Sequence, residues 1–178
     1  MKRPVNVAKN EALSGNQCLI KVFVYGTLMR GYANHDYYCR GAMKIEPAEI
    51  WGRLYDLGCY PVLEVPEELI LACGTADPVA DAETQAQFAQ KLNGQPELPR
   101  PEGDWELING ELVTFDNPQV YLPPIDGLES FNPESSSGYQ RVLMLVKASE
   151  ITPAWVYRVE NGKSMGERIH GRWGCRQR

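Results

Sequence analysis

The sequence is poor in the side chains that build metal and redox sites. It has only two histidines, His35 and His170, and its five cysteines are widely spread without a Cys-x-x-Cys pair. Clustered histidines or paired thiols are the usual signs of a zinc site or a thiol redox site. We therefore expect no metal and no cofactor, and reduced cysteines that act mainly in packing.

Long apolar runs and an excess of positive charge are missing as well. No stretch approaches the ~20 apolar residues of a membrane helix, and the N-terminal MKRPVNVAKNEALSGNQ is polar where a secretory signal would be apolar. The net charge of −5 argues against a protein that neutralises phosphates along a nucleic acid. We expect a cytoplasmic protein that acts on a small molecule and binds neither membrane nor nucleic acid.

The chain is long enough for one domain with a sizeable core, since it has 178 residues of which 43% are hydrophobic. Three parts are predicted: a flexible polar N-terminal arm (1–19), a folded domain (20–160) and a basic C-terminal tail (161–178) that is solvated. Within the domain, 66–109 is expected to be an insertion, which could be a lid, a partner surface or structurally neutral.

Periodicity and turn formers predict an α+β domain with few helices. Strands are expected in CLIKVFVYG, AEIWGRLYDLGCYPVLEV (two strands), GELVTFD, QRVLMLVKA and AWVYRVE, which are short, apolar and bounded by turn formers. One helix is expected in DPVADAETQAQFAQKLNG, with Asp77 as its cap and Pro78 in its first turn. A shorter helix is expected over Pro123–Phe131, and 93–110 is expected to be a loop rich in Pro, Gly and acidic residues.

The first predicted strand ends abruptly at VFVYGTLMRGYANH. A strand that stops at Gly26 leaves the amides of Gly26, Thr27 and Leu28 free, and glycine lets a ligand approach the backbone closely. Such amides bind a carboxylate or an oxyanion, while Tyr25 would supply an aromatic wall. Gly-Thr after a strand is also an ordinary turn, so this stretch alone does not decide between the two interpretations.

A second candidate stretch is IDGLESFNPESSSGYQRVLMLV. Asp126 and Glu129 are three residues apart, so on a helix they can share a face. A carboxyl group beside the apolar Leu128 and Phe131 would be partly desolvated, which raises its pKa and suits it to move a proton near neutral pH. The alternative is a solvated acidic pair near a helix end.

Taken together, these stretches resemble the γ-glutamylcyclotransferase-like superfamily, especially its γ-glutamylamine cyclotransferase and AIG2-like branches. The matching motifs occur in the family's order and cover most of 21–159: YGTLMRGYANH, WGRLYDLGCYPVLEV, GELVTFD, DGLESF, GYQRVLMLV and AWVYRV. The resemblance implies a small mixed β-barrel with a few outer helices, a cavity at one end of the barrel, and a single glutamate as the catalytic acid/base. By motif position that glutamate is Glu129, and the substrate pocket is lined by Tyr25, Gly26, Thr27, Leu28 and Tyr139.

The resemblance also implies the reaction. A γ-glutamyl amide or amine would be cyclised to 5-oxoproline with release of the amine, by an acyltransferase- or lyase-type step without a cofactor. Arg141, two residues after Tyr139, would pair with Glu129 or with a substrate carboxylate, or would brace the preceding loop. Asn34 and His35 are interpreted as hydrogen bonders that fix the turn. The leaving amine and the oligomeric state are left open.

Two other functions fit the same sequence. The barrel could bind a small carboxylate without turnover, or the 66–109 segment could dock a protein partner. Glu129 together with Tyr139 favours the enzyme, because a binding module has no evident need for a proton shuttle.

Overall fold

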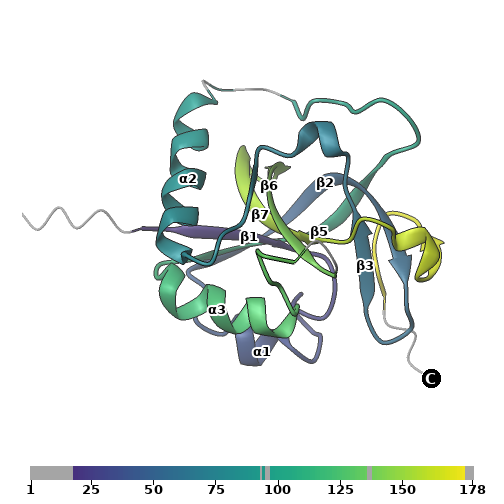
Figure 1. Cartoon of the computed structure of the whole chain (residues 1–178), viewed down its shortest axis with the longest axis horizontal. Helices are drawn as coiled ribbons and strands as arrows, with labels where there is room; N and C mark the ends of the chain where they lie inside the picture. The colour runs from purple at the N-terminus through teal and green to yellow at the C-terminus, as the bar shows by residue number, and fades with distance from the viewer. Residues whose placement is uncertain (1–17, 93, 95–96, 136–137, 175–178) are drawn as a thin grey trace, which may run out of the picture.

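The structure is a computed structural model that describes residues 18–92, 94, 97–135 and 138–174. Nearly all of the predicted N-terminal arm, residues 1–17, lies outside the described residues. The remainder forms strands, a few helices and the turns between them, coloured along the chain in Figure 1. Among these residues no helix is both long and apolar enough to cross a membrane.

A closed barrel of five strands forms the centre of the fold. The strand order is β2-β5-β1-β7-β6, and a pairing between Glu49 of β2 and Lys147 of β6 closes the ring. The β1–β7 pair is parallel and the other neighbours in the ring are antiparallel. The predicted α+β fold, a small mixed β-barrel with few outer helices, is confirmed. The barrel strands are β1 (Ile20–Val24), β2 (Lys44–Asp56), β5 (Glu106–Phe115), β6 (Gln140–Lys147) and β7 (Ile151–Arg158).

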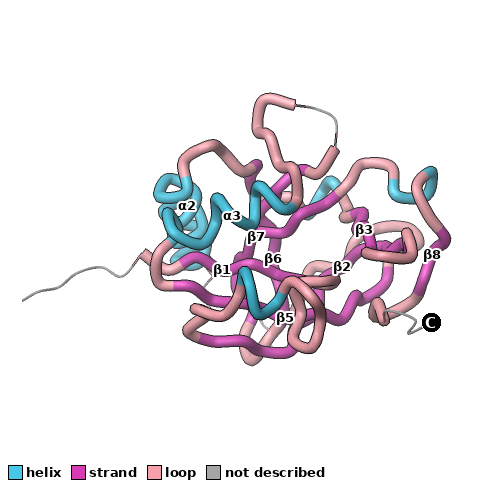
Figure 2. The backbone as a smooth tube through the Cα atoms, turned by 90° about the horizontal axis from the view of Figure 1, so that it is seen from below, coloured by secondary structure: helices cyan, strands magenta, loops and turns pink. Residues whose placement is uncertain are grey.

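Helices cover one side of this barrel, as Figures 1 and 2 show from two directions. They are α1 (His35–Tyr38), α2 (Pro78–Lys91) and α3 (Pro118–Leu128). Two short 3-10 turns, η1 (Glu67–Leu69) and η2 (Gly162–Ser164), lie away from these helices, and η2 packs against β2 and β3 (Pro61–Glu64). The predicted cap of α2 is present, because the Asp77 carboxylate accepts hydrogen bonds from the amides of Val79 and Ala80 at 2.9 and 3.2 Å. The second predicted helix starts earlier than expected, at Pro118, where a proline suits a first helical turn.

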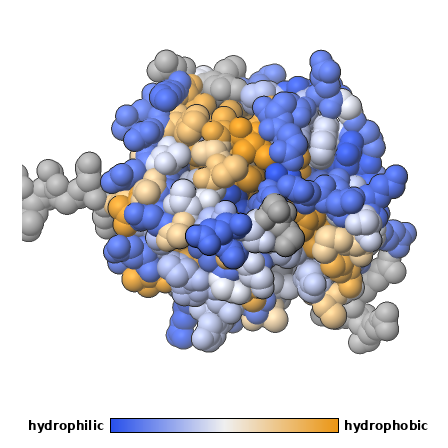
Figure 3. Space-filling view, in the orientation of Figure 1, coloured by the Kyte–Doolittle hydropathy of each residue, from blue (hydrophilic) through white to orange (hydrophobic). Residues whose placement is uncertain are grey.

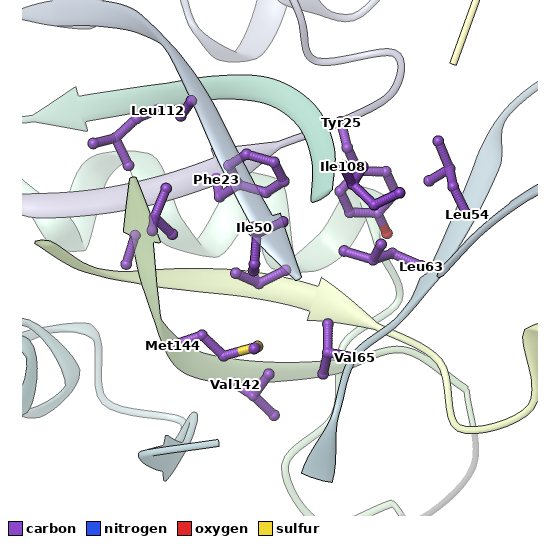
Figure 4. Close-up of a cluster of buried hydrophobic side chains, with 14 of the residues drawn as sticks. Phe23, Tyr25, Ile50, Leu54, Leu63, Val65, Ile108, Leu112, Val142 and Met144 are labelled. Atoms are coloured by element: carbon purple, nitrogen blue, oxygen red, sulfur yellow. The ribbon is translucent and has the colours of Figure 1, made fainter. Parts of the chain in front are cut away.

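Alternation along the strands divides most of the buried apolar side chains between two large clusters, and a third, smaller cluster lies beside β3. Phe23 of β1 points into the barrel with Ile50, Ile108 and Met144, as the close-up in Figure 4 shows. The neighbouring residues of β1 point outward and pack under α2 and α3, in a second cluster that includes Val22, Val24, Ala82, Leu122, Ile125 and Trp155. On the surface, hydrophobic side chains gather beside α2, whereas most of the same face is hydrophilic (Figure 3).

The segment 66–109, expected to be an insertion, contributes to the fold at both of its ends. It contains η1, β4 (Ala72–Cys73), which pairs with β6, and α2. The predicted loop over 93–110 ends earlier than expected, because residues 106–110 pair with β2 and Ile108 is fully buried in the barrel. Burial of this side chain outweighs the turn-forming composition around it.

The predicted C-terminal tail is also packed rather than solvated as far as residue 174. β3 (Pro61–Glu64) and β8 (Glu167–Ile169) both pair with the outer half of β2, on the side of the barrel opposite α2 (Figure 2). Trp173 is 2% exposed, and its ring lies 5.1 Å from that of Tyr32. The interpretation of this segment as a solvated tail is therefore wrong as far as residue 174. It rested on the basic charge of the segment and overlooked Trp173, whose buried side chain holds the segment against the barrel.

Candidate active site

A cavity of about 650 Å³ opens at one end of the barrel. Its walls come from the turn after β1, the end of α3, the residues just before β6, and the turn between β2 and β3. These segments are far apart in sequence and meet because β1, β6 and β7 are neighbours in the barrel. All six residues predicted for the site line the cavity: Tyr25, Gly26, Thr27, Leu28, Glu129 and Tyr139.

The turn after β1 is held by hydrogen bonds from the segment that follows it. The side chain of Asn34 donates from Nδ2 to the Thr27 hydroxyl at 2.9 Å, and the backbone amide of Asn34 donates to the Thr27 carbonyl at 3.1 Å. Nδ1 of His35 lies 2.8 Å from the Leu28 carbonyl oxygen. Asn34 and His35 therefore fix the turn, as expected. In the described part of the chain, no hydrogen bond uses the amides of Gly26, Thr27 or Leu28, which are thus available to a ligand.

Gly26 is needed for packing rather than for ligand approach. A Cβ atom at this position would lie 2.8 Å from Cδ of Pro61, closer than real Cβ contacts allow. The space beside the glycine is therefore filled by the first residue of β3. This corrects the expectation that the missing side chain leaves room for a ligand, although the amides themselves still line the cavity.

Glu129 lies directly after the last residue of α3, as its C-cap. Burial raises the pKa of the Glu129 carboxyl to about 7, and the negative charge of Asp126 acts in the same direction. The carbonyl end of a helix also disfavours a negative charge. Among the described residues, no side chain donates a hydrogen bond to this carboxyl. Glu129 is therefore a carboxyl group that can gain or lose a proton near neutral pH.

Two tyrosines flank this carboxyl. The Tyr25 hydroxyl donates to the carbonyl of Tyr157 at 2.8 Å, and that of Tyr139 lies 3.5 Å from the carbonyl oxygen of Pro61. Burial raises the pKa of both phenols, and the charge of Glu129 adds to the effect. Both rings therefore remain neutral and form polar aromatic walls rather than a second acid/base group.

Arg141 does not reach into the cavity. Its side chain is 1% exposed and donates to the carboxylates of Asp126 and Asp81 and, at 2.9 Å, to the Thr75 carbonyl. Of the roles considered for Arg141, the structure supports bracing, and pairing with Glu129 is not observed. Asp126 is engaged with Arg141 and does not line the cavity.

Sequence reasoning missed the wall formed by Cys59, Tyr60 and Pro61. These residues belong to the hairpin of β2 and β3 and carry no local signal of a site; the pairing of the two strands brings them to the cavity. Within the described residues, no group of three His, Cys, Asp or Glu side chains is placed to hold a metal ion.

Comparison with known proteins identifies a related family. Residues 22–86 match the family model described as "Gamma-glutamyl cyclotransferase, AIG2-like". This segment contains Tyr25, Gly26, Thr27 and Leu28 but ends before Glu129 and Tyr139. The expected resemblance to the γ-glutamylcyclotransferase-like superfamily is thus confirmed. A search among curated proteins found no match.

The fold is shared with a solved structure. YkqA from Bacillus subtilis is 21% identical with a TM-score of 0.52, over 87% of this chain and 39% of YkqA. The chain thus spans well under half the length of that protein. An AIG2-like protein from Mus musculus, also named GGACT, is 18% identical with a TM-score of 0.49, over 89% of this chain and 90% of the mouse protein.

Proposed function

From its resemblance to the γ-glutamylcyclotransferase-like superfamily, we propose that the chain is an enzyme that cyclises a γ-glutamyl amide or amine to 5-oxoproline and releases the amine. One observation carries the proposal: a partly buried glutamate with a pKa near 7 lines the same cavity as three backbone amides that no hydrogen bond uses in the described chain. A proton acceptor facing hydrogen-bond donors is what intramolecular acyl transfer requires.

Glu129 acts as the base and then as the acid. Its carboxylate takes a proton from the α-ammonium group of the substrate, and the freed amine attacks the γ-carbonyl carbon. A ring C–N bond forms and the carbonyl oxygen becomes an oxyanion. When this intermediate collapses, the bond to the leaving nitrogen breaks, and protonated Glu129 returns its proton to that nitrogen. The ring nitrogen then gives up its remaining surplus proton through the Glu129 carboxylate to the released amine, so that neutral lactam and an ammonium ion leave the cavity. A pKa near 7 serves both steps, because the group is neither too weak as a base nor too weak as an acid.

The amides of Gly26, Thr27 and Leu28 hold the developing oxyanion or the α-carboxylate of the substrate. Loss of one oxyanion donor typically costs about 100-fold or more in rate. Because the nucleophile and the carbonyl belong to one molecule, the cavity walls have only to hold the substrate in its folded conformation. Such orientation can lower a barrier by ~7–11 kcal/mol in favourable systems.

The charge of the cavity supports recognition of the α-ammonium group. Glu129 is the only ionisable acid or base of the Asp, Glu, Lys, Arg or His type among the described residues that line it. A single negative charge in a partly desolvated cavity attracts a single positive charge, and the α-ammonium group is the one that must lose a proton.

The proposal is tested by the release of 5-oxoproline from a panel of γ-glutamyl compounds, with the wild-type chain and with Glu129→Gln. We expect turnover of at least one compound, an activity that rises with pH through about 7 as Glu129 ionises, and a loss of at least about 100-fold in Glu129→Gln.

Glu134→Gln is the matched control, since Glu134 is exposed, lies outside the cavity lining, and undergoes the same chemical change. It should retain wild-type activity. If no compound is turned over while one of them raises the melting temperature of wild type and Glu129→Gln equally, the cavity is a binding site and the enzyme proposal is wrong.

A further inference from the structure

Asp126, three residues before Glu129, is the centre of a polar network with the buried side chains of Arg141 and Tyr157. The Tyr157 hydroxyl donates to Oδ1 of Asp126 at 2.6 Å. Nη1 of Arg141 donates to both carboxylate oxygens, at 2.5 Å for Oδ2. These donors come from β6 and β7, whereas Asp126 belongs to α3, so the network ties the end of the helix to the barrel wall.

The guanidinium group of Arg141 is held at both terminal nitrogens and lies near two aromatic rings. It lies 4.5 Å from the ring centre of Phe131 and 5.4 Å from that of Trp155. Its other terminal nitrogen, Nη2, pairs with Asp81 at the start of α2. Hydrogen bonds to ionised groups are short and directional, so this environment leaves Asp126 little freedom to move.

Asp126 and Glu129 are linked through the same helix end. The amide of Glu129 donates to the carbonyl of Ile125 at 3.0 Å, and the amide of Phe131 donates to the carbonyl of Asp126 at 2.9 Å. The two carboxyl groups are three residues apart and thus one turn apart along the chain. Fixing Asp126 therefore fixes where the Glu129 side chain leaves the backbone.

We propose that Asp126 is a positioning residue for Glu129: held by Arg141 and Tyr157, it anchors the end of α3 and keeps a negative charge one turn before the cavity carboxyl. This inference rests on the proposed function for its catalytic meaning.

Electrostatics supports this assignment. The negative charge of Asp126 raises the pKa of Glu129. The charge of Glu129 in turn raises the pKa of the Tyr25 and Tyr139 phenols, which are both neutral. Burial raises the pKa of Asp126, while Arg141 and Tyr157 oppose that rise by stabilising the carboxylate. Among the residues that the structure describes, Asp126 is therefore the one charged neighbour that raises the pKa of Glu129.

The test compares Asp126→Asn with Asp81→Asn. Both substitutions replace a carboxylate that pairs with Arg141 by an amide of the same shape. Only Asp126 lies on the helix turn that carries Glu129. The Glu129 carboxyl is titrated by NMR in protein labelled with ¹³C at the glutamate carboxyl carbons, and its signal is identified by its absence in Glu129→Gln. The pH profile of 5-oxoproline release is measured on the same proteins.

We expect Asp126→Asn to move the Glu129 titration and the acid limb of the activity profile together to lower pH, while Asp81→Asn leaves both at the wild-type position near pH 7. Equal titrations in all three proteins, or equal shifts in the two variants, would overturn the proposal. The NMR titration does not depend on turnover, so an inactive wild type refutes the proposed enzyme without deciding the placement of Asp126.

Breaking a buried ion pair from one side can cost about 3–5 kcal/mol, so Asp126→Asn could fail to fold. The double variant Asp126→Asn/Arg141→Gln removes both charges of the pair and leaves two amides. The same downward shift of the Glu129 titration is expected in it, and an unshifted titration contradicts the proposal.

Discussion

At the scale of single residues, the features that suit Glu129 to proton transfer also lower the stability of the folded chain. Its carboxyl group is partly removed from water, lies at the carbonyl end of α3, and has Asp126 as its charged neighbour. Each of these disfavours the ionised form. At neutral pH the folded chain therefore holds a charge that would be more stable in the unfolded chain.

Glu129→Gln should stabilise the protein at high pH and not at low pH. The pKa is near 4.5 in the unfolded chain and about 7 in the folded one, so the folded state binds the proton more tightly. Stability from Glu129 is fully present below pH 4.5 and is lost as pH rises through about 7. Since one pKa unit corresponds to about 1.4 kcal/mol, the gain in Glu129→Gln should approach about 3 kcal/mol above pH 7.

Denaturant unfolding of wild type and Glu129→Gln at pH 8 and near pH 4.5 measures this difference. Glu134→Gln, which makes the same chemical change at an exposed position, is the matched control. A Glu129→Gln variant that is less stable than wild type at pH 8 would mean that the Glu129 carboxylate is stabilised by a partner, contrary to the arrangement described.

At the scale of elements, the sequence predicted the helix α3 but not its bounds. Residues Pro123–Phe131 were expected to be helical from their apolar spacing, whereas the helix begins at Pro118 and ends at Leu128. The start was missed because Pro123 and Pro124 suggest a helix beginning rather than a helix interior. The end was missed because the chain leaves the helix through a Schellman motif with Ser130, not glycine, at the left-handed position.

Ser130→Gly should stabilise this helix end. Ser130 has φ of 52°, a conformation that glycine adopts at little cost, and its amide donates to the Gly127 carbonyl at 3.3 Å. Relief of the strain should be worth about 1 kcal/mol. That corresponds to a rise in melting temperature of about 2–4 °C for a chain of this size.

Thermal unfolding of Ser130→Gly and Ser130→Ala separates the backbone from the side chain. Ser130→Ala removes the hydroxyl but keeps the strain, so its melting temperature should stay near that of wild type. If Ser130→Gly melts lower than Ser130→Ala, the left-handed conformation is not strained.

At the scale of the whole molecule, local patterns gave the strands, whereas closure of the barrel and the cavity depend on contacts between distant segments. The strand patterns predicted five barrel strands, but not that Glu49 and Lys147 close the ring. Gly26 and Glu129 are more than a hundred residues apart, so no local pattern could predict that they share a pocket. That prediction came from the resemblance to a known family. Trp173 was missed for the same reason, since its partners lie in the barrel and not near it in sequence.

The charge of the whole cavity leads to a prediction about the leaving amine. Among the described lining residues, Glu129 is the only ionisable acid or base of the Asp, Glu, Lys, Arg or His type, and the others are aromatic, aliphatic or neutral polar. A carboxylate on the leaving group would thus meet a negative charge and no positive one. At a separation of about 8 Å in a medium of intermediate polarity, such a repulsion is worth roughly 1–2 kcal/mol, or about tenfold in rate.

Three γ-glutamyl compounds whose leaving amines each contain four carbons test this: the derivatives of n-butylamine, 1,4-diaminobutane and 4-aminobutyrate. We expect kcat/KM to be about tenfold or more lower for the 4-aminobutyrate derivative than for the butylamine derivative, with the diamine derivative at least as good as the latter. The difference should shrink as salt screens the charge. Equal or faster turnover of the 4-aminobutyrate derivative would show that a cation reaches the mouth of the cavity in the working enzyme. A difference that persists at high salt would instead indicate that shape, rather than charge, selects the leaving group.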